Sequence, residues 1–324
     1  MNTETRRASS TGEVRPESKL RSYARLAKLD VYDYYLSIFV AASAVVLPSG
    51  ALNARTVLTL LGFLIGEVLV TVALVAFDDL TGFRDGSDIK NYGPDNPLRK
   101  KLRKPLVAGT LEPREAERFG WIAALLGAAA WAGTIAIAPA SPVWTVVVTG
   151  VLYVLALQYS YGLKLSYRGL QEIFLVWLGL SMVIAPYGLV SGQFSWFVFV
   201  QGVLFGFGPL MFGVYSNSND VEGDRLVNRP TVAALVSERG NTIFIGALSF
   251  AEFAVGALAS ALGAAPWWFV LLMLPATALR ARQYYLGFRA GDIMRARKLG
   301  FKVHRVSVGL LIVANLLIGL GGPA

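Results

Sequence analysis

The chain has 324 residues, of which 55% are hydrophobic and only 16% are charged, and its mean hydropathy is +0.53. Soluble domains usually carry about 25% charged residues, so this composition excludes an ordinary soluble protein and indicates a polytopic membrane protein. The chain has no cysteine, which excludes disulfides and thiolate sites, and its single histidine, His304, excludes a histidine-rich metal site. The formal charge is +9, and the basic residues concentrate in a few loops. This distribution is typical of membrane orientation rather than of nucleic-acid binding.

The chain begins with a polar and basic stretch that includes Arg6, Arg7 and Arg15. The apolar run that follows this stretch is not succeeded by a small-residue cleavage site, so a secretory signal peptide is not indicated. We expect a disordered cytoplasmic tail over residues 1–24 and one membrane domain over residues 25–324.

Nine apolar segments follow the tail, each compatible with a membrane-spanning helix. They cover residues 32–49, 56–78, 119–138, 142–159, 171–190, 195–215, 242–262, 266–281 and 303–321. Short, nearly uncharged loops alternate with loops that hold most of the lysines and arginines. By the positive-inside rule, this alternation places the N-terminus in the cytoplasm and the C-terminus outside. The sequence therefore predicts an all-α cell-membrane protein with nine transmembrane helices around a central cavity.

An acidic cluster lies at the end of the second apolar segment and contains Asp78, Asp79, Asp85 and Asp88. Carboxylates are costly beside a bilayer, and hard oxygen ligands suit Mg²⁺, which usually bridges protein carboxylates to substrate phosphates. The alternative is an acidic helix-end loop that binds nothing. That alternative explains the turn-forming dipeptide Asp85-Gly86. It explains poorly why Asp78 and Asp79 directly follow apolar residues.

A second acidic cluster follows the sixth apolar segment. Asp220 and Asp224 are four residues apart and Asn217 is three residues before Asp220, so all three share one helical face. Like charges at this spacing repel, and a bound cation would relieve that repulsion. The alternative is a solvated face paired with Arg225 or Arg229. Both clusters fall at cytoplasmic helix ends, so we expect their two polar loops to form a cap over one cavity that binds Mg²⁺ and a diphosphate.

Two further loops carry candidate cations for a diphosphate. Arg103 and Lys104 precede a proline, and either side chain would stabilise negative charge on a leaving diphosphate. Lys164 could hold a phosphate in a loop where Tyr159 and Tyr161 line the cavity mouth. Inside-positive anchoring and an interfacial aromatic belt with a snorkelling lysine are the ordinary alternatives.

Other polar residues complete the expected substrate site. Glu67 lies inside the second apolar segment, three helical turns before Asp78, and we expect it to line the deeper cavity. A buried, protonated glutamate that makes a helix–helix hydrogen bond is the alternative. We expect Asn217, Arg225 and Asp85 to lie beside the substrate.

Taken together, these motifs resemble the UbiA superfamily of intramembrane prenyltransferases, which has nine transmembrane helices. That family carries two aspartate-rich motifs after helices two and six, roughly Asn-Asp-x-x-Asp with a further Asp, and Asp-x-x-x-Asp. The matching residues here are Asp78, Asp79, Asp88, Asp220 and Asp224. Residues 104–109 are similar to the family's Arg-Pro-Leu-x-x-Gly, and residues 159–165 look like a segment of the chlorophyll-synthase branch. The resemblance runs from about residue 25 to the C-terminus.

Three positions depart from the family pattern. The usual Asn is Asp78, the usual middle Asp is Gly82, and the usual Arg is Lys104. Asp85, three residues after Gly82, is a possible substitute for the missing carboxylate. These changes favour a divergent branch, in secondary metabolism, over a housekeeping quinone enzyme.

The resemblance implies a mechanism and its partners. Two Mg²⁺ ions, held by Asp79, Asp88, Asp220 and Asp224, would bind a prenyl diphosphate, while Lys104, Lys164 and Arg103 neutralise the leaving diphosphate. The allylic cation would then attack a small-molecule acceptor, expected to be aromatic, in a cavity open to the lipid bilayer.

Three other functions compete with prenyl transfer. A terpene cyclase of the same fold would quench the cation within its own chain, with no acceptor. A CDP-alcohol phosphotransferase is disfavoured because its acids form one continuous motif, and a transporter is disfavoured because its charged residues would lie near the midplane.

Overall fold

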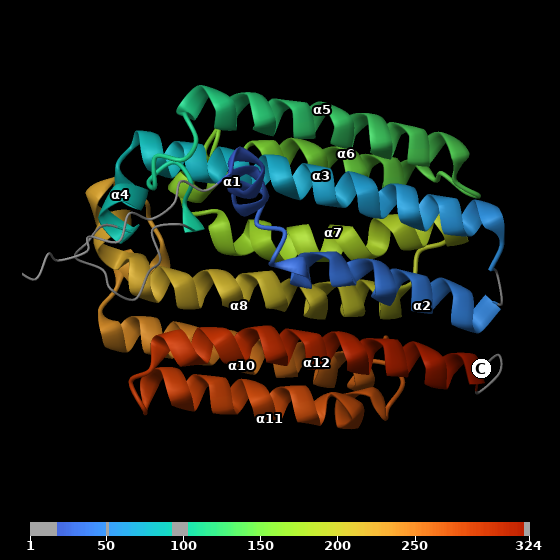
Figure 1. The fold of residues 1–324 in the computed structure, drawn as a ribbon. Helices are drawn as coiled ribbons and strands as arrows, with labels where there is room; N and C mark the ends of the chain where they lie inside the picture. The colour runs from blue at the N-terminus through green and yellow to red at the C-terminus, as the bar shows by residue number, and fades with distance from the viewer. Residues whose placement is uncertain (1–17, 50–51, 93–102, 321–324) are drawn as a thin grey trace, which may run out of the picture.

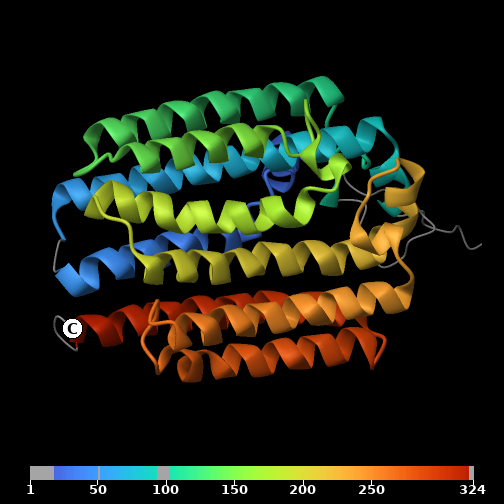
Figure 2. The same ribbon diagram turned by 180° about the vertical axis from the view of Figure 1, so that it is seen from behind.

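We describe a computed structural model of the protein, in which residues 18–49, 52–92 and 103–320 are placed. In these ranges every regular element is helical, and the long helices run side by side as a bundle (Figures 1 and 2). The elements are α1 (Lys19–Leu26), the 3-10 helix η1 (Tyr32–Leu36), α2 (Ser37–Ser49), α3 (Ala54–Arg84), α4 (Ser87–Tyr92), α5 (Pro113–Ile137), α6 (Val143–Leu157), the 3-10 helix η3 (Leu165–Arg168), α7 (Gln171–Ser191), α8 (Trp196–Leu226), α9 (Val232–Leu235), α10 (Glu238–Ala261), α11 (Phe269–Phe288) and α12 (Ile293–Leu320).

Each of the nine apolar segments overlaps a helix in the described ranges, although α2 and α6 are short. Six of these helices are long and apolar enough to cross a membrane: α3, α5, α7, α8, α10 and α12. Two further apolar stretches, Tyr32–Leu47 and Val143–Leu157, are shorter. The chain is thus an all-helical, multi-pass membrane protein, as the composition predicts.

Side-chain caps define where the two helices that carry the acidic clusters begin. The Asn53 side chain accepts a hydrogen bond from the Thr56 amide at the start of α3, and Ser195 does the same for the Val198 amide at the start of α8. At the other end of α3, Gly86 has a φ of 85° and turns the chain into α4. Both helices continue past their apolar segments, so Asp78, Asp79, Asp220 and Asp224 lie on helical backbone, while Asp85 lies at the bend between α3 and α4.

Close packing holds each of the two cluster-bearing helices against a neighbouring long helix. The helix pairs α3 with α5 and α7 with α8 make the most extensive contacts in the bundle. A Cβ added to Gly206 on α8 would lie 2.6 Å from the carbonyl oxygen of Val176 on α7, so only glycine permits this approach. The α8 backbone is therefore fixed against α7 a few turns from the acidic residues.

One end of the bundle is polar. The C-terminal ends of α3 and α8 meet there with α4 and the segment that joins α8 to α10, while α12 ends at the opposite end (Figures 1 and 2). The expected boundary between tail and membrane domain, at residue 24, falls inside α1. Residues 1–17, which form most of that expected tail, lie outside the described residues.

Candidate active site

The short helix α4 brings the two acidic clusters together. It packs against α8, and a Cβ on Gly223 would lie 2.6 Å from the amide carbon of Asn91. An ion pair between Lys90 and Glu222, 3.4 Å long, joins the same two helices at the surface. Because α4 follows α3 directly, Asp88 on α4 lies between the ends of α3 and α8.

The first cluster is built around the buried carboxylate of Asp79. Lys104 Nζ lies 2.7 Å from Asp79 Oδ1 and 2.8 Å from Asp88 Oδ2, so this ammonium group bridges the two aspartates. Lys28 Nζ lies 2.9 Å from the same Oδ1 atom. The other oxygen, Asp79 Oδ2, is buried and has no hydrogen-bond partner. Two lysines thus share one oxygen of Asp79 while its second oxygen is left to accept a ligand.

Gly82 makes the position of Asp88 possible. A Cβ on Gly82 would lie 2.8 Å from the carboxyl carbon of Asp88, closer than atoms of this kind approach. The carboxylate of Asp88 therefore lies where a side chain at position 82 would begin. The carboxylate of Asp88 thus lies where the side chain of an aspartate at position 82 would begin.

The carboxylate of Asp78 faces a different set of groups. Ser160 Oγ donates a hydrogen bond of 2.6 Å to Asp78 Oδ1, and an Arg229 guanidinium nitrogen lies 3.9 Å from the same oxygen. Arg229 also donates to Gln171, at 3.2 Å, and its guanidinium carbon lies 5.1 Å from the centre of the Tyr167 ring. Its Nε atom is buried and has no hydrogen-bond partner, which leaves one spare donor.

The second cluster lies on the last turns of α8, as its spacing predicts. Asp224 is buried, and Thr231 Oγ1 donates a hydrogen bond of 2.9 Å to its Oδ2 atom. Asn217, on the same face as Asp220, is buried with its Nδ2 atom lacking a hydrogen-bond partner. The second cluster therefore offers two carboxylates and an amide on one face.

These donors fit magnesium that is also bound by substrate oxygens. In the described ranges no three acidic or histidine side chains come close enough to hold a metal ion by themselves. Magnesium commonly uses one or two carboxylates together with substrate phosphate oxygens, so a pair of aspartates on one helical face is a sufficient protein contribution.

The cations at this end of the bundle keep their charge. Burial lowers the pKa of the Lys104 ammonium, but the carboxylates of Asp79 and Asp88 outweigh burial and hold that pKa well above its ordinary value. Burial likewise lowers the pKa of Arg229, and the neighbouring Tyr159, Asp78 and Asp224 raise it overall. Both groups therefore present fixed positive charge to an anion.

Three other predicted residues lie near this charge cluster. Asp85 accepts hydrogen bonds from Tyr167 Oη, at 2.5 Å, and from Ser87 Oγ, at 2.8 Å. Lys164 is exposed, and its Nζ atom lies 5.3 Å from the centre of the same Tyr167 ring. Tyr159 is buried against Phe174, with ring centroids 4.8 Å apart. Asp85 and Lys164 are thus both linked to the cluster through Tyr167.

Three predicted residues make contacts of another kind. Tyr161 donates a hydrogen bond to Glu117, at 2.7 Å, and stacks on Phe77 with ring centroids 4.6 Å apart. Exposed Arg103 lies 3.3 Å from Asp30, and exposed Arg225 donates to the carbonyl oxygen of Ala234 at 3.0 Å. The partners in these three contacts, Glu117, Asp30 and the Ala234 carbonyl, lie outside the two acidic clusters.

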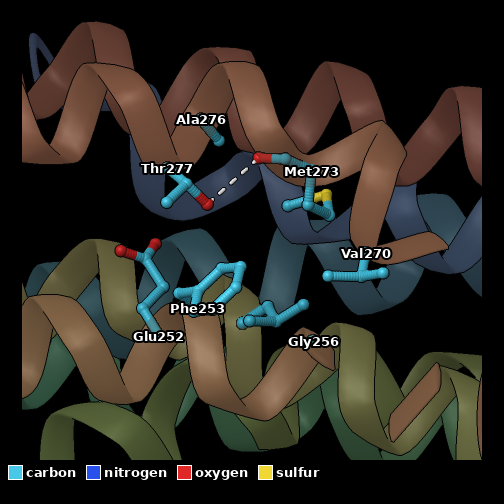
Figure 3. Close-up of a pocket in the computed structure, with 8 residues that line it drawn as sticks. Glu252, Phe253, Gly256, Val270, Met273, Ala276 and Thr277 are labelled. Carbon is cyan, nitrogen blue, oxygen red and sulfur yellow. Dashed lines mark hydrogen bonds between the residues drawn. The ribbon is translucent and has the colours of Figure 1, made fainter. Parts of the chain in front are cut away.

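The intramembrane carboxylates lie apart from the clusters. Glu67 is fully buried, accepts a hydrogen bond of 2.7 Å from Ser37 Oγ, and leaves its Oε2 atom without a partner. Glu252 forms a two-bond ion pair with Arg280, with distances of 2.5 and 3.0 Å. Figure 3 shows Glu252 beside a small cavity between α10 and α11, facing Thr277. This ion pair links α10 to α11, which explains the carboxylate at position 252.

Lys28 and Arg229 are site residues that the sequence did not single out. Lys28 adopts a φ of 49°, which is uncommon for a residue with a side chain, and its ammonium group lies 2.9 Å from Asp79. A conformation of this kind, observed at a charged residue, points to a functional position. No sequence signal distinguishes Lys28 from the other basic residues near it, whereas Arg229 follows the second cluster by only five residues.

A basic cavity of about 290 Å³ adjoins Lys28. Its charged lining consists of Arg21, Arg25, Lys28, Arg103 and Asp30. In the described lining of this cavity, basic side chains therefore outnumber the single acidic one.

Comparison with known proteins identifies the family. A model of the UbiA prenyltransferase family matches residues 36–321. The chain belongs to the UbiA prenyltransferase family. No curated protein matches the sequence at a significant level.

Solved structures with the same fold are UbiA homologues of low sequence identity. A homologue from Archaeoglobus fulgidus bound to GPP and Mg²⁺ has a TM-score of 0.61 and 15% identity, covering 92% of this chain and 99% of the other. A homologue from Aeropyrum pernix K1 has a TM-score of 0.59 and 18% identity, covering 87% and 97% of the two chains. A digeranylgeranylglyceryl phosphate synthase has a TM-score of 0.56 and 14% identity, covering 94% and 99%.

Proposed function

We propose that the protein transfers a prenyl group from a prenyl diphosphate to a small-molecule acceptor in a magnesium-dependent reaction. The observation that carries this proposal is the meeting of two acidic clusters with three buried or half-buried cations at one end of the bundle. The cations are Lys28, Lys104 and Arg229. A diphosphate with its magnesium is the ligand whose charges match such a mixed arrangement.

Each cation retains a donor for the diphosphate. An ammonium group has three N–H donors, and Lys104 donates one hydrogen bond to Asp79 while it forms an ion pair with Asp88. Lys28 has one ion pair, with Asp79, and Arg229 has a buried Nε–H without a partner. We assign these groups to the non-bridging oxygens of the diphosphate, with Lys164 as an additional exposed contact.

The second cluster is the place for the metal. Asp220 and Asp224 would hold Mg²⁺, with Asn217 on the same face. When bound, the ion neutralises negative charge on the diphosphate. A homologue of the same fold from A. fulgidus is bound to GPP and Mg²⁺, which supports the use of magnesium. Asp78, Asp79 and Asp88 complete the acidic side of the site.

The reaction balances without any further reagent. The bond between C1 of the prenyl group and the diphosphate oxygen breaks, and the electron pair leaves with the oxygen. The acceptor atom forms a bond to C1 and releases its proton to the departing diphosphate. Fixed cations around that oxygen favour the transition state because negative charge develops there.

The membrane setting follows from the same arrangement. We place nine helices across the bilayer, with the polar end and its two loops in the cytoplasm. The basic loops lie at this end, as the positive-inside rule requires. The prenyl tail would then extend among the helices, while the diphosphate stays at the cytoplasmic face.

Release of inorganic diphosphate tests the proposal. Purified protein in detergent is given C10, C15 and C20 prenyl diphosphates with Mg²⁺, first alone and then with an acceptor-containing membrane extract, and the products are analysed by mass spectrometry. We expect release only when the extract is present, together with an adduct heavier by one prenyl group, and no release in EDTA. Release without acceptor, accompanied by a cyclic hydrocarbon, would identify a terpene cyclase instead. Activity that survives EDTA would contradict the metal assignment.

A further inference from the structure

Arg229 faces both acidic clusters. One of its guanidinium nitrogens lies 3.9 Å from the carboxylate of Asp78, on α3. Its backbone amide donates a hydrogen bond of 2.8 Å to the carbonyl oxygen of Asp224, on α8, and the Asp224 carboxylate lies within electrostatic range of the guanidinium group. The residue before it, Asn228, adopts a φ of 51°, which asparagine tolerates better than most residues. This turn after α8 places one cation within reach of both clusters.

Tyr167, in η3, contacts the guanidinium group of Arg229 through its ring. The central carbon of that group lies 5.1 Å from the centre of the ring, a distance at which an aromatic face attracts a guanidinium group. This attraction restrains the cation without occupying any of its N–H groups. The guanidinium group donates one hydrogen bond to Gln171, and its Nε–H is buried without a partner. The ring therefore holds Arg229 and leaves a donor for a diphosphate.

The hydroxyl of Tyr167 is anchored at the bend between α3 and α4. It donates a hydrogen bond of 2.5 Å to Asp85 Oδ2, while Asp85 Oδ1 accepts from the amide and the hydroxyl of Ser87, at 3.0 and 2.8 Å. Burial raises the pKa of the Tyr167 hydroxyl and the hydrogen bond to Asp85 raises it further, so the hydroxyl stays a donor. Both oxygens of Asp85 are thus engaged by the chain, unlike those of Asp79, whose Oδ2 atom has no hydrogen-bond partner.

Building on the proposed function, we propose that Tyr167 is a positioning residue, whose ring holds Arg229 toward the diphosphate and whose hydroxyl is fixed by Asp85. The ammonium group of Lys164 lies 5.3 Å from the centre of the same ring, so one aromatic side chain contacts two of the cations assigned to the diphosphate. Asp85 then serves as the anchor of Tyr167 and not as a substitute for the carboxylate that is absent at Gly82. Tyr167 joins the bend after α3 to the cation that faces both clusters.

A double-mutant cycle tests whether Tyr167 acts through Arg229. Protein in detergent with Mg²⁺ is titrated with geranyl thiolodiphosphate, an analogue that does not ionise readily, and its Kd is measured by calorimetry. We expect Tyr167→Leu to weaken binding by about tenfold, the scale of a desolvated cation–π contact. Tyr167→Phe keeps the ring and should stay within about threefold of the wild type, because only a hydrogen bond is lost. In the Arg229→Gln background, Tyr167→Leu should have no further effect.

The control is Tyr285→Leu, which removes an exposed tyrosine of α11 and should leave the Kd unchanged. Additive losses from Tyr167→Leu and Arg229→Gln would overturn the inference, since a merely structural defect weakens binding in either background. If Tyr167→Leu does not fold, the cycle is made with Tyr167→Phe. Its smaller loss should likewise vanish beside Arg229→Gln, and additive losses there would count equally against the inference.

Manganese binding tests the role of Asp85. With the analogue present, free Mn²⁺ is measured by electron paramagnetic resonance. We expect Asp85→Asn to keep the wild-type affinity for Mn²⁺, whereas Asp224→Asn loses affinity. Weaker Mn²⁺ binding by Asp85→Asn would assign Asp85 to the metal and overturn the inference. Failure of the wild type to bind the analogue would contradict the proposed function itself, whereas wild-type binding that Tyr167→Leu leaves unchanged would overturn the inference alone.

Discussion

The carboxylate of Asp88 fills the space in which the side chain of residue 82 would begin, since a Cβ on Gly82 would lie 2.8 Å from its carboxyl carbon. This single relationship joins the end of α3 to α4, and α4 in turn packs on α8. The two acidic clusters, separated by more than 130 residues in the chain, meet because small residues on α3 and α8 admit α4 between them.

Replacing Gly82 with alanine should disturb this junction. The added methyl group must displace Asp88 or shift α4, and overpacking of this kind costs about 1–3 kcal/mol. We expect a lower melting temperature and slower diphosphate release, measured side by side. Gly133→Ala is the matched control, because a Cβ at Gly133 meets no atom within 4 Å. A Gly82→Ala variant as stable and active as that control would show that Asp88 does not need its present position.

Removal of Asp79 should affect stability as well as activity. Its carboxylate is 1% exposed and is the partner of both Lys28 and Lys104. Breaking a buried pair by removal of one partner typically costs about 3–5 kcal/mol, because a charge is left uncompensated. We therefore expect Asp79→Ala to lower the denaturant midpoint substantially. A midpoint equal to that of the wild type would mean that the lysines find other partners.

Arg229 should prove more important than its sequence context suggests. Arg229→Gln removes the guanidinium group that faces Asp78 and is stacked on Tyr167. We expect a fall of about 10²-fold or more in kcat/KM for the prenyl diphosphate, the range found when one stabilising donor is removed from an active site. Arg239→Gln changes an exposed arginine near the start of α10 and serves as the control. Equal activity of the two variants would remove Arg229 from the site.

Tyr161 gives the opposite expectation. Its hydroxyl donates to Glu117 and its ring stacks on Phe77, so Tyr161→Phe should cost about 1 kcal/mol of stability through the lost hydrogen bond. Diphosphate release should stay within about threefold of the wild type. The lost hydrogen bond is worth about 1 kcal/mol, and neither of its partners belongs to the two acidic clusters. A much larger loss of rate, at unchanged stability, would place Tyr161 in the substrate site after all.

Hydropathy and spacing predict a large part of this architecture. Long apolar runs specify helices, and the four-residue separation of Asp220 and Asp224 places both on one face whether the helix ends early or late. The sequence predicts Lys104 as a cation for the diphosphate, but its pairing with Asp79 and Asp88, and the places of Lys28 and Arg229, could not be predicted in the same way. Lys28, Lys104 and Arg229 are brought to the aspartates by tertiary packing, and basic residues at a cytoplasmic helix end have an ordinary explanation in membrane orientation.

The sequence also could not separate Tyr159 from Tyr161. Both follow the same helix, two residues apart, and both read as residues of a cavity mouth. The structure buries Tyr159 against Phe174, whereas Tyr161 packs beside Phe77 and Glu117. Two residues of difference just after a helix end are enough to point the two side chains in different directions. Which of them faces the interior depends on the neighbours against which each one packs.

The most direct test of the central claim is the rate of diphosphate release by Asp220→Ala, measured together with its melting temperature. Asp220 is half-buried, and the two lysines of the first cluster, Lys28 and Lys104, form their ion pairs with Asp79 and Asp88. We predict a loss of release of about 10²-fold or more, with nearly unchanged melting, because the variant removes a magnesium ligand and little packing. Wild-type release by a folded Asp220→Ala protein would contradict the assignment of the second cluster to magnesium and diphosphate.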